Sequence, residues 1–174
     1  MSGRLVALVL IAAAAIGGGA LYWLQIYAFY EPLAPTGPED VQVALAEGGA
    51  APLPHADFRG IDSDSSPIRY RACFTLADGA QAVLDSAAPA RDPEPLVAPG
   101  WFDCFDATAV AAALDEGTAT AYAGAAALPY GIDRVVAVFE DGRGVAWNQI
   151  NACGAAFFDG DPLPPHCPPP PAES

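Results

Sequence analysis

The sequence predicts an α+β protein: an N-terminal transmembrane helix followed by a small disulfide-stabilised domain with an antiparallel sheet and one main helix. Three observations predict this fold class. Residues 5–30 carry no charge, the chain after them contains short runs of alternating apolar and polar residues, and all four cysteines follow the apolar segment. A length of 174 residues suits one such domain.

The apolar segment has the length of a membrane span. A helix over 5–27 extends about 34 Å, against about 30 Å for a hydrocarbon core. Arg4 is the only charge before it, which favours a cytoplasmic N-terminus. We therefore expect residues 1–30 to be a lipid-embedded, single-pass anchor in a bacterial inner membrane, with the later residues in the periplasm. Aromatic residues gather at its outer end, as at a membrane boundary: Tyr22, Trp23, Tyr27, Phe29 and Tyr30.

A cleaved signal peptide is the second interpretation of this segment. Gly18 and Ala20 satisfy the small-residue rule for cleavage after Ala20. The apolar run is longer than a usual signal core and continues through bulky residues at 21–24, which favours the anchor. Both interpretations send residues 31–174 to the same compartment.

The cysteines predict two disulfides in an oxidising space. We expect Cys73–Cys104 and Cys153–Cys167, because each bond closes a local loop. The alternative is a metal site formed by Cys153, His166 and Cys167. Their spacing fits no zinc pattern, so we predict no metal and no other cofactor.

The exported part divides into three segments. Residues 31–40 carry three prolines and predict an extended tether. Residues 41–160 form the domain. Residues 161–174 hold seven prolines and predict a polyproline-like or disordered tail.

Alternating side chains predict the strands. The run at 68–75 alternates strictly, with even-numbered residues on one face and odd-numbered residues on the other. Two strands at 134–140 and 144–150 flank Asp141-Gly142, a strong signal for a two-residue hairpin. Shorter strands at 41–45 and 118–123 complete a predicted sheet of four or five strands.

The main helix is predicted over 106–116. Asp106 can cap its N-terminus and Gly117 can end it, while Val110 and Leu114 share one face. A helical turn at 81–85 and a proline-rich loop at 86–99 precede it.

The charge balance excludes one class of partner. The chain has seven arginines and no lysine against 21 acidic residues, a net charge of −14. Nucleic-acid binding requires clustered positive charge, so we expect no nucleic-acid partner.

Several polar residues are candidates for ligand binding. Asp62 and Asp64 lie in a run that either opens a calcium loop or forms a turn with Asp and Ser side chains bonded to nearby amides, and the turn is favoured. Arg69 and Arg71 share a strand face, where they either offset carboxylates or hold an anion through their guanidinium groups.

The segment before the main helix offers further candidates. Trp101, Asp103 and Asp106 surround a cysteine, as a binding surface or as a disulfide buried under aromatic rings. The two carboxylates suit either acid–base chemistry or helix capping, and capping is favoured. No nucleophile motif or phosphate loop occurs, so we predict no catalytic residue and lean away from an enzyme.

Long segments of the chain resemble an uncharacterised bacterial family of small single-span exported proteins. The resemblance lies in LYWLQIYAFYE, ADFRGIDSDSSPIRYRACF, APGWFDCFDA, YGIDRVVAVFEDGRGVAWNQINACG and the CPPPP tail. It implies no established activity. Some similar proteins bear the name histidine kinase, which the residues here do not support. Both histidines lie in proline-rich stretches, and the ATP-binding boxes of a kinase are missing.

The function expected from these observations is a membrane-anchored, non-enzymatic accessory or interaction domain of the periplasm. Its expected partners are membrane lipid, through the helix, and another envelope protein. The alternative is a periplasmic domain that binds or senses a small ligand or ion through the candidate residues above.

Overall fold

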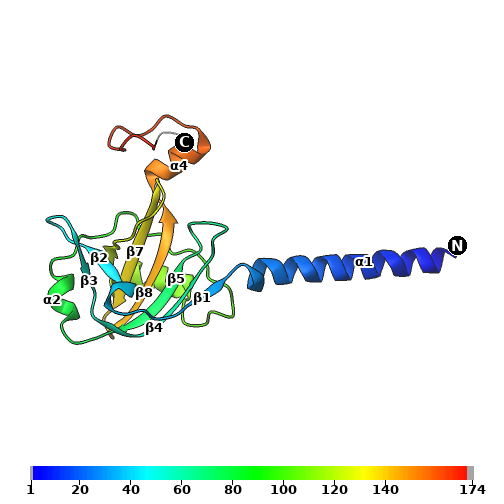
Figure 1. Ribbon diagram of the computed structural model, residues 1–174, viewed down its shortest axis with the longest axis horizontal. Coiled ribbons are helices and arrows are strands. Elements are labelled where there is room, and N and C mark those ends of the chain that lie inside the picture. Colours follow the sequence, from blue (N-terminus) through cyan, green and yellow to red (C-terminus); the bar gives the residue numbers. More distant parts are fainter. Residues whose placement is uncertain (1, 172–174) are drawn as a thin grey trace.

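The computed structural model describes residues 2–171. Figure 1 shows a straight helix, α1 (Gly3–Trp23), projecting from a β-rich domain. A π-helical segment, η1 (Leu24–Ala28), continues it. An 18-residue window of the combined helix has a mean hydropathy of 2.3, and the helix is long and apolar enough to cross a membrane. The N-terminal helix is confirmed, whereas the choice between anchor and signal peptide stays a prediction.

The domain is built on one antiparallel sheet of six strands. Their order across the sheet is β1-β4-β5-β8-β7-β6, and a separate ribbon pairs β2 with β3. The α+β class is therefore confirmed, with more strands than the four or five expected. The strands are β1 (Glu31–Leu33), β2 (Gln42–Ala44), β3 (Ala50–Pro52), β4 (His55–Asp62), β5 (Arg71–Leu76), β6 (Ala119–Ala123), β7 (Ile132–Phe139) and β8 (Arg143–Ile150).

Strands β1 and β4 are not anticipated by the pattern of the sequence. The register between β4 and β5 shifts between Ala56 and Arg59, which is a β-bulge. Asp57 sits in this bulge with a φ of 54°. The bulge breaks the two-residue period that would have revealed the strand. Strand β1, at the start of the expected tether, pairs with the far end of β4.

Strand β5 begins three residues later than the alternation predicts. The carbonyls of Pro67 and Ile68 accept hydrogen bonds from the side chains of Asn148 and Arg71, not from backbone amides of a neighbouring strand. Residues 68–70 therefore form no backbone pairing with the strands next to β5. The predicted faces are correct, because Tyr70 belongs to one core cluster and Cys73 to the other.

The sheet buries an apolar cluster on each face. One cluster includes Val43, Leu53 and Phe74, under the β2–β3 ribbon and α2 (Ala80–Leu84). The second includes Phe102, Phe105, Val110 and a completely buried Trp147, under the segment 98–106 and α3 (Ala107–Glu116). Neighbours along β7 alternate between the clusters, Val135 in the second and Val136 in the first.

The predicted hairpin and main helix are both present. Strands β7 and β8 pair from Ile132↔Ile150 to Val138↔Gly144, and residues 140–142 connect them. The loop thus holds three residues instead of two, with Gly142 in the left-handed conformation at φ 85°. Helix α3 begins after Asp106, whose side chain accepts from the amides of Thr108 and Ala109.

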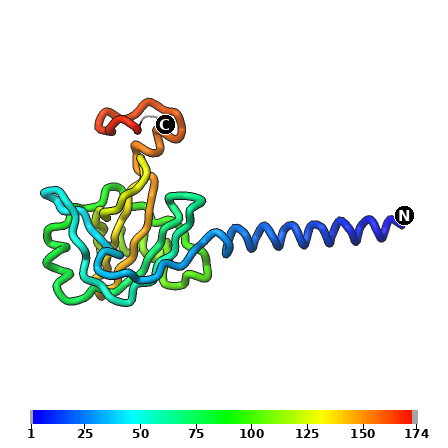
Figure 2. Tube along the Cα trace, viewed as in Figure 1, coloured from blue at the N-terminus to red at the C-terminus, as the bar shows by residue number. Residues whose placement is uncertain are grey.

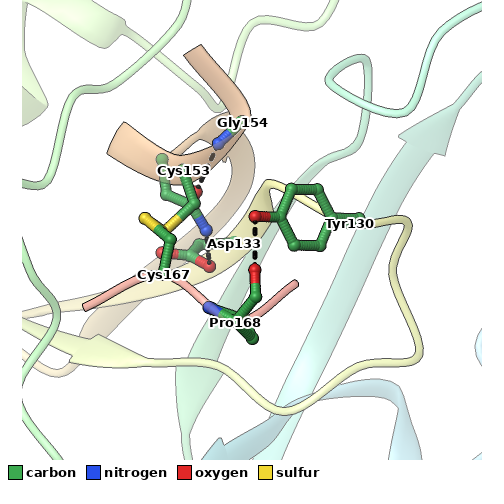
Figure 3. The surroundings of a disulfide bond; sticks show 7 residues. Tyr130, Asp133, Cys153, Gly154, Cys167 and Pro168 are labelled. Atoms are coloured by element: carbon green, nitrogen blue, oxygen red, sulfur yellow. Dashed lines mark hydrogen bonds between the residues drawn. A yellow bond between two sulfur atoms is a disulfide. The ribbon is translucent and has the colours of Figure 1, made fainter. Parts of the chain in front are cut away.

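A fourth helix, α4 (Ala152–Asp159), was not predicted, since its sequence has no apolar period. It leaves the end of β8, and the C-terminal segment folds back beside it (Figure 2). Close packing fixes its start: a Cβ on Gly154 would lie 2.2 Å from the carbonyl oxygen of Gly131. Cys153 joins Cys167, and the Tyr130 hydroxyl donates to the carbonyl of Pro168 (Figure 3).

Both predicted disulfides are confirmed, as Cys73–Cys104 and Cys153–Cys167. Their loops span 31 and 14 residues, worth about 4 and about 3 kcal/mol in the chain-entropy model. The first bond also lies within the second core cluster, whereas the second ties α4 to the tail at the periphery.

We therefore expect the double variant Cys73→Ala/Cys104→Ala to lower the apparent Tm of the full chain in micelles more than Cys153→Ala/Cys167→Ala does. Removal of the first pair loses loop constraint and core packing together. Thermal denaturation followed by circular dichroism measures both. Equal shifts, or a larger shift for the peripheral pair, would contradict this ranking.

Candidate functional site

Trp101 holds the end of the domain nearest the N-terminal helix against that helix. Its indole Nε1 donates a 2.8 Å hydrogen bond to the carbonyl of Ile26, 75 residues earlier. Its ring stacks on Tyr27, with centroids 6.3 Å apart, and meets Tyr30 edge-on at 6.1 Å. Each such ring pair contributes about 0.5–1.5 kcal/mol. The domain is thus held against the end of η1.

Arg69 joins the same cluster. Its guanidinium carbon lies 5.4 Å from the ring centroid of Tyr30 and 5.7 Å from that of Phe29. These are cation–π distances. Tyr30 therefore brings two of the predicted site residues, Arg69 and Trp101, together. We call Ile26, Tyr27, Tyr30, Arg69 and Trp101 the collar.

Arg71 is buried and fully engaged by the backbone. Its Nε donates to the carbonyl of Leu96, and one terminal nitrogen donates to the carbonyls of Ile68 and Tyr70. The other terminal nitrogen reaches the carbonyl of Val97 at 3.2 Å. Burial lowers the pKa of Arg71 to about 10. The side chain pins the loop at 96–97 to β5, so its donors serve the fold.

The two aspartates of the polar run lie in different surroundings. Asp62 ends β4, half-buried, and accepts from the amide of Ser63. Burial raises the pKa of its carboxyl, an effect only partly opposed by that amide and by Arg134. The hydroxyls of Ser63 and Ser65 hydrogen-bond to each other at 2.8 Å, and Asp64 is exposed. The turn interpretation accounts for these contacts.

The carboxylates before the main helix also have separate partners. Asp103 forms an exposed ion pair with Arg59 at 2.9 Å. Asp106 caps α3 through two backbone amides. Neither contact joins one carboxylate to the other, as a shared acid–base site would require.

A groove that sequence reasoning missed opens between α3 and the sheet. It encloses about 430 Å³. Its walls come from β4, β5, β8 and α3, so no contiguous motif marks it. The residues that the sequence singled out at this groove are Asp106 and the two cysteines of the predicted Cys73–Cys104 bond.

The cysteine–histidine cluster is the other group with ligand chemistry. Donor atoms of Cys153, His166 and Cys167 lie within 4.8 Å of one another. Figure 3 shows the two sulfurs joined to each other beside Asp133 and Gly154. Thiolates bind metal, whereas disulfide sulfurs do not serve as thiolates. The oxidised bond therefore engages two of the three donors.

Comparison with known proteins places the domain in a family. A model of a family of unknown function, DUF6446, matches residues 41–168. The chain belongs to this family. The match starts just before β2 and ends just after Cys167, so it takes in both disulfides and the groove, whereas α1 and β1 precede it. No curated protein and no solved structure matches the sequence.

The collar predicts that Trp101 controls how freely the domain moves relative to the helix. We expect Trp101→Ala to broaden the distance distribution between spin labels at Ala12 and Ala112, because hydrogen bond and ring stacking are both lost. Trp101→Phe, which keeps a ring, should broaden it less. Double electron–electron resonance on the full chain in nanodiscs measures both. Phe158→Ala, on α4, is the control, and a Trp101→Ala distribution as narrow as the control's would contradict the clasp.

Arg71 should not tolerate lysine. Arg71→Lys keeps the charge but cannot serve carbonyls on both sides of the guanidinium, so buried and part-buried acceptors lose their partners. We expect a loss of about 3 kcal/mol in unfolding free energy. Arg91→Lys, at an exposed arginine, is the matched control. Chemical denaturation compares the two, and equal stabilities would refute the structural role.

Proposed function

We propose that the chain is a membrane-anchored accessory protein of the bacterial envelope, whose periplasmic domain acts by contacting another envelope protein and not by catalysis. The collar is the observation that carries this proposal. A freely tethered enzyme needs no fixed orientation, whereas a module that presents a surface to a membrane neighbour gains from one, because less orientational freedom is lost on binding.

The helix and the disulfides support the proposed compartment. Arg4 before the apolar helix favours a cytoplasmic N-terminus. Two disulfides in the remaining chain suit the oxidising periplasm. Both features support one topology, with α1 in the inner membrane and the domain outside.

The two buried arginines whose pKa values are lowered serve the fold, which favours a role in protein interaction over a role in catalysis. Burial lowers the pKa values of Arg71 and Arg134. Arg71 holds four carbonyls, while Arg134 donates to Asn148 and lies 3.4 Å from the ring centroid of Tyr70. These contacts also weaken the alternative of an anion sensor built on Arg71.

The proposal is tested by crosslinking the tagged full chain in living cells and identifying the products by mass spectrometry. We expect one envelope protein at near-stoichiometric yield. Its yield should fall in Trp101→Ala, which frees the domain without altering the span. Val97→Ala removes an exposed apolar side chain outside the collar and should leave the yield unchanged.

Recovery of the full chain alone, with no protein above the background of an untagged strain, would reject the accessory role. So would equal recovery with Trp101→Ala and with the unaltered chain, since the collar would then have no part in the contact.

A further inference from the structure

The groove beside α3 has an apolar interior. Its floor is the Cys73–Cys104 disulfide together with Val145 of β8, and its helical wall is formed by Val110 and Ala113. The volume of about 430 Å³ falls within the range of ligand clefts, about 300–1,000 Å³. The interior therefore suits an apolar group, such as a large aliphatic or aromatic side chain.

The rim of the groove carries four charges, of which the two positive ones are already paired. Arg59 pairs with Asp103, and Arg143 pairs with Asp141 at 2.8 Å. Both guanidinium groups also lie over aromatic rings. The pairing leaves the rim carboxylates Asp57 and Asp106 without a cation of their own among the described residues.

The two rim carboxylates are held in place by short contacts. The β-bulge of β4 places Asp57 at the groove, where one carboxylate oxygen accepts a 2.9 Å hydrogen bond from the Thr75 hydroxyl. One oxygen of Asp106 accepts both capping bonds of α3. Each carboxylate keeps a second oxygen to receive a cation. The groove thus combines an apolar floor with two fixed negative charges at its mouth.

The charge of the whole chain acts in the same direction. A net charge of −14 produces a negative field that attracts cations and repels anions. The negative field repels a fatty acid or another anionic amphiphile from this mouth. A lysine or arginine next to an apolar side chain is complementary in both charge and polarity, because the cation meets the rim carboxylates and the apolar side chain meets the floor.

We infer that the groove between α3 and the sheet is the docking site for a segment of the partner protein that presents a large apolar side chain flanked by basic residues. This inference rests on the proposed function, because it names the surface through which that contact is made. The apolar side chain enters over the disulfide, and the flanking cations meet Asp57 and Asp106.

The inference is tested with the full chain in lipid nanodiscs and three labelled peptides, measured by fluorescence anisotropy. The peptides contain Lys-Leu-Trp-Lys, Glu-Leu-Trp-Glu and Lys-Ala-Ala-Lys. We expect only the first to bind, and added salt to weaken it. Ala109→Trp, which fills the groove from an exposed position on α3, should abolish binding, whereas Ala112→Trp, on the same helix outside the groove, should not.

A charge variant that preserves the fold tests the rim. Asn caps helices as well as Asp and tolerates a positive φ, so Asp57→Asn/Asp106→Asn keeps the backbone while removing both charges. We expect about fivefold weaker binding of the lysine peptide, the size of two exposed charge pairs. Asp115→Asn/Glu116→Gln, on α3 outside the groove, should change nothing.

Three results would overturn the inference: equal binding of the glutamate peptide, binding that survives Ala109→Trp, or occupation of the groove by a fluorescent fatty acid or a second copy of the chain. The cellular crosslink separates this failure from failure of the proposed function. If Ala109→Trp still recovers the envelope protein, the groove is excluded and the accessory role stands. If the unaltered chain recovers nothing, the accessory role itself fails.

Discussion

The covalent bond between Cys73 and Cys104 is the constraint on which the rest of the domain depends. It joins β5, a central strand of the sheet, to the short segment between Trp101 and the cap of α3. Trp101, on one side of that segment, belongs to the collar, and α3, on the other side, forms a wall of the groove. One bond therefore sets the position of both candidate surfaces relative to the sheet.

This constraint compensates for an amino-acid composition that favours little regular secondary structure. Gly and Pro together number 35 of 174 residues, and the segment that covers the second core cluster has little regular structure before α3. Phe105 of this segment packs edge-on against Trp147, and Phe102 belongs to the same cluster, without a helix or strand to order them. A cross-link from β5 removes much of the conformational entropy that this segment has in the unfolded chain. The apolar contacts therefore need to supply less free energy to order it.

Five of the six arginines after the span make side-chain contacts within the protein, and Arg91 is exposed. Among the arginines after the span, Arg69 and Arg134 lie over aromatic rings, and Arg71 donates to backbone carbonyls. Arg59 and Arg143 each hold one carboxylate. The acidic residues are three times as numerous as the basic ones, and within residues 2–171 most of them face solvent without an arginine partner. The fold thus separates its charges, with cations fixing loops and anions setting the surface potential.

Features set by neighbouring residues could be predicted from the sequence, and features set by distant residues could not. The cap at Asp106, the hairpin at Gly142 and both disulfide loops are local. The collar depends on a hydrogen bond between residues 75 positions apart, and the groove on four separate segments. Strand β4 escaped detection because its bulge at Asp57 interrupts the period, and that same bulge brings the Asp57 carboxylate to the groove.

The proposed membrane anchor changes what the proposed contact requires. Two proteins in the same membrane meet at a high effective concentration, so a groove of this size can act with an affinity that would be too weak between soluble molecules. The rigid collar adds to this effect, because a domain held in one orientation loses little further freedom when it docks. In this arrangement the helix supplies proximity, the collar supplies orientation, and the groove needs to contribute only the selectivity for an apolar side chain beside a positive charge.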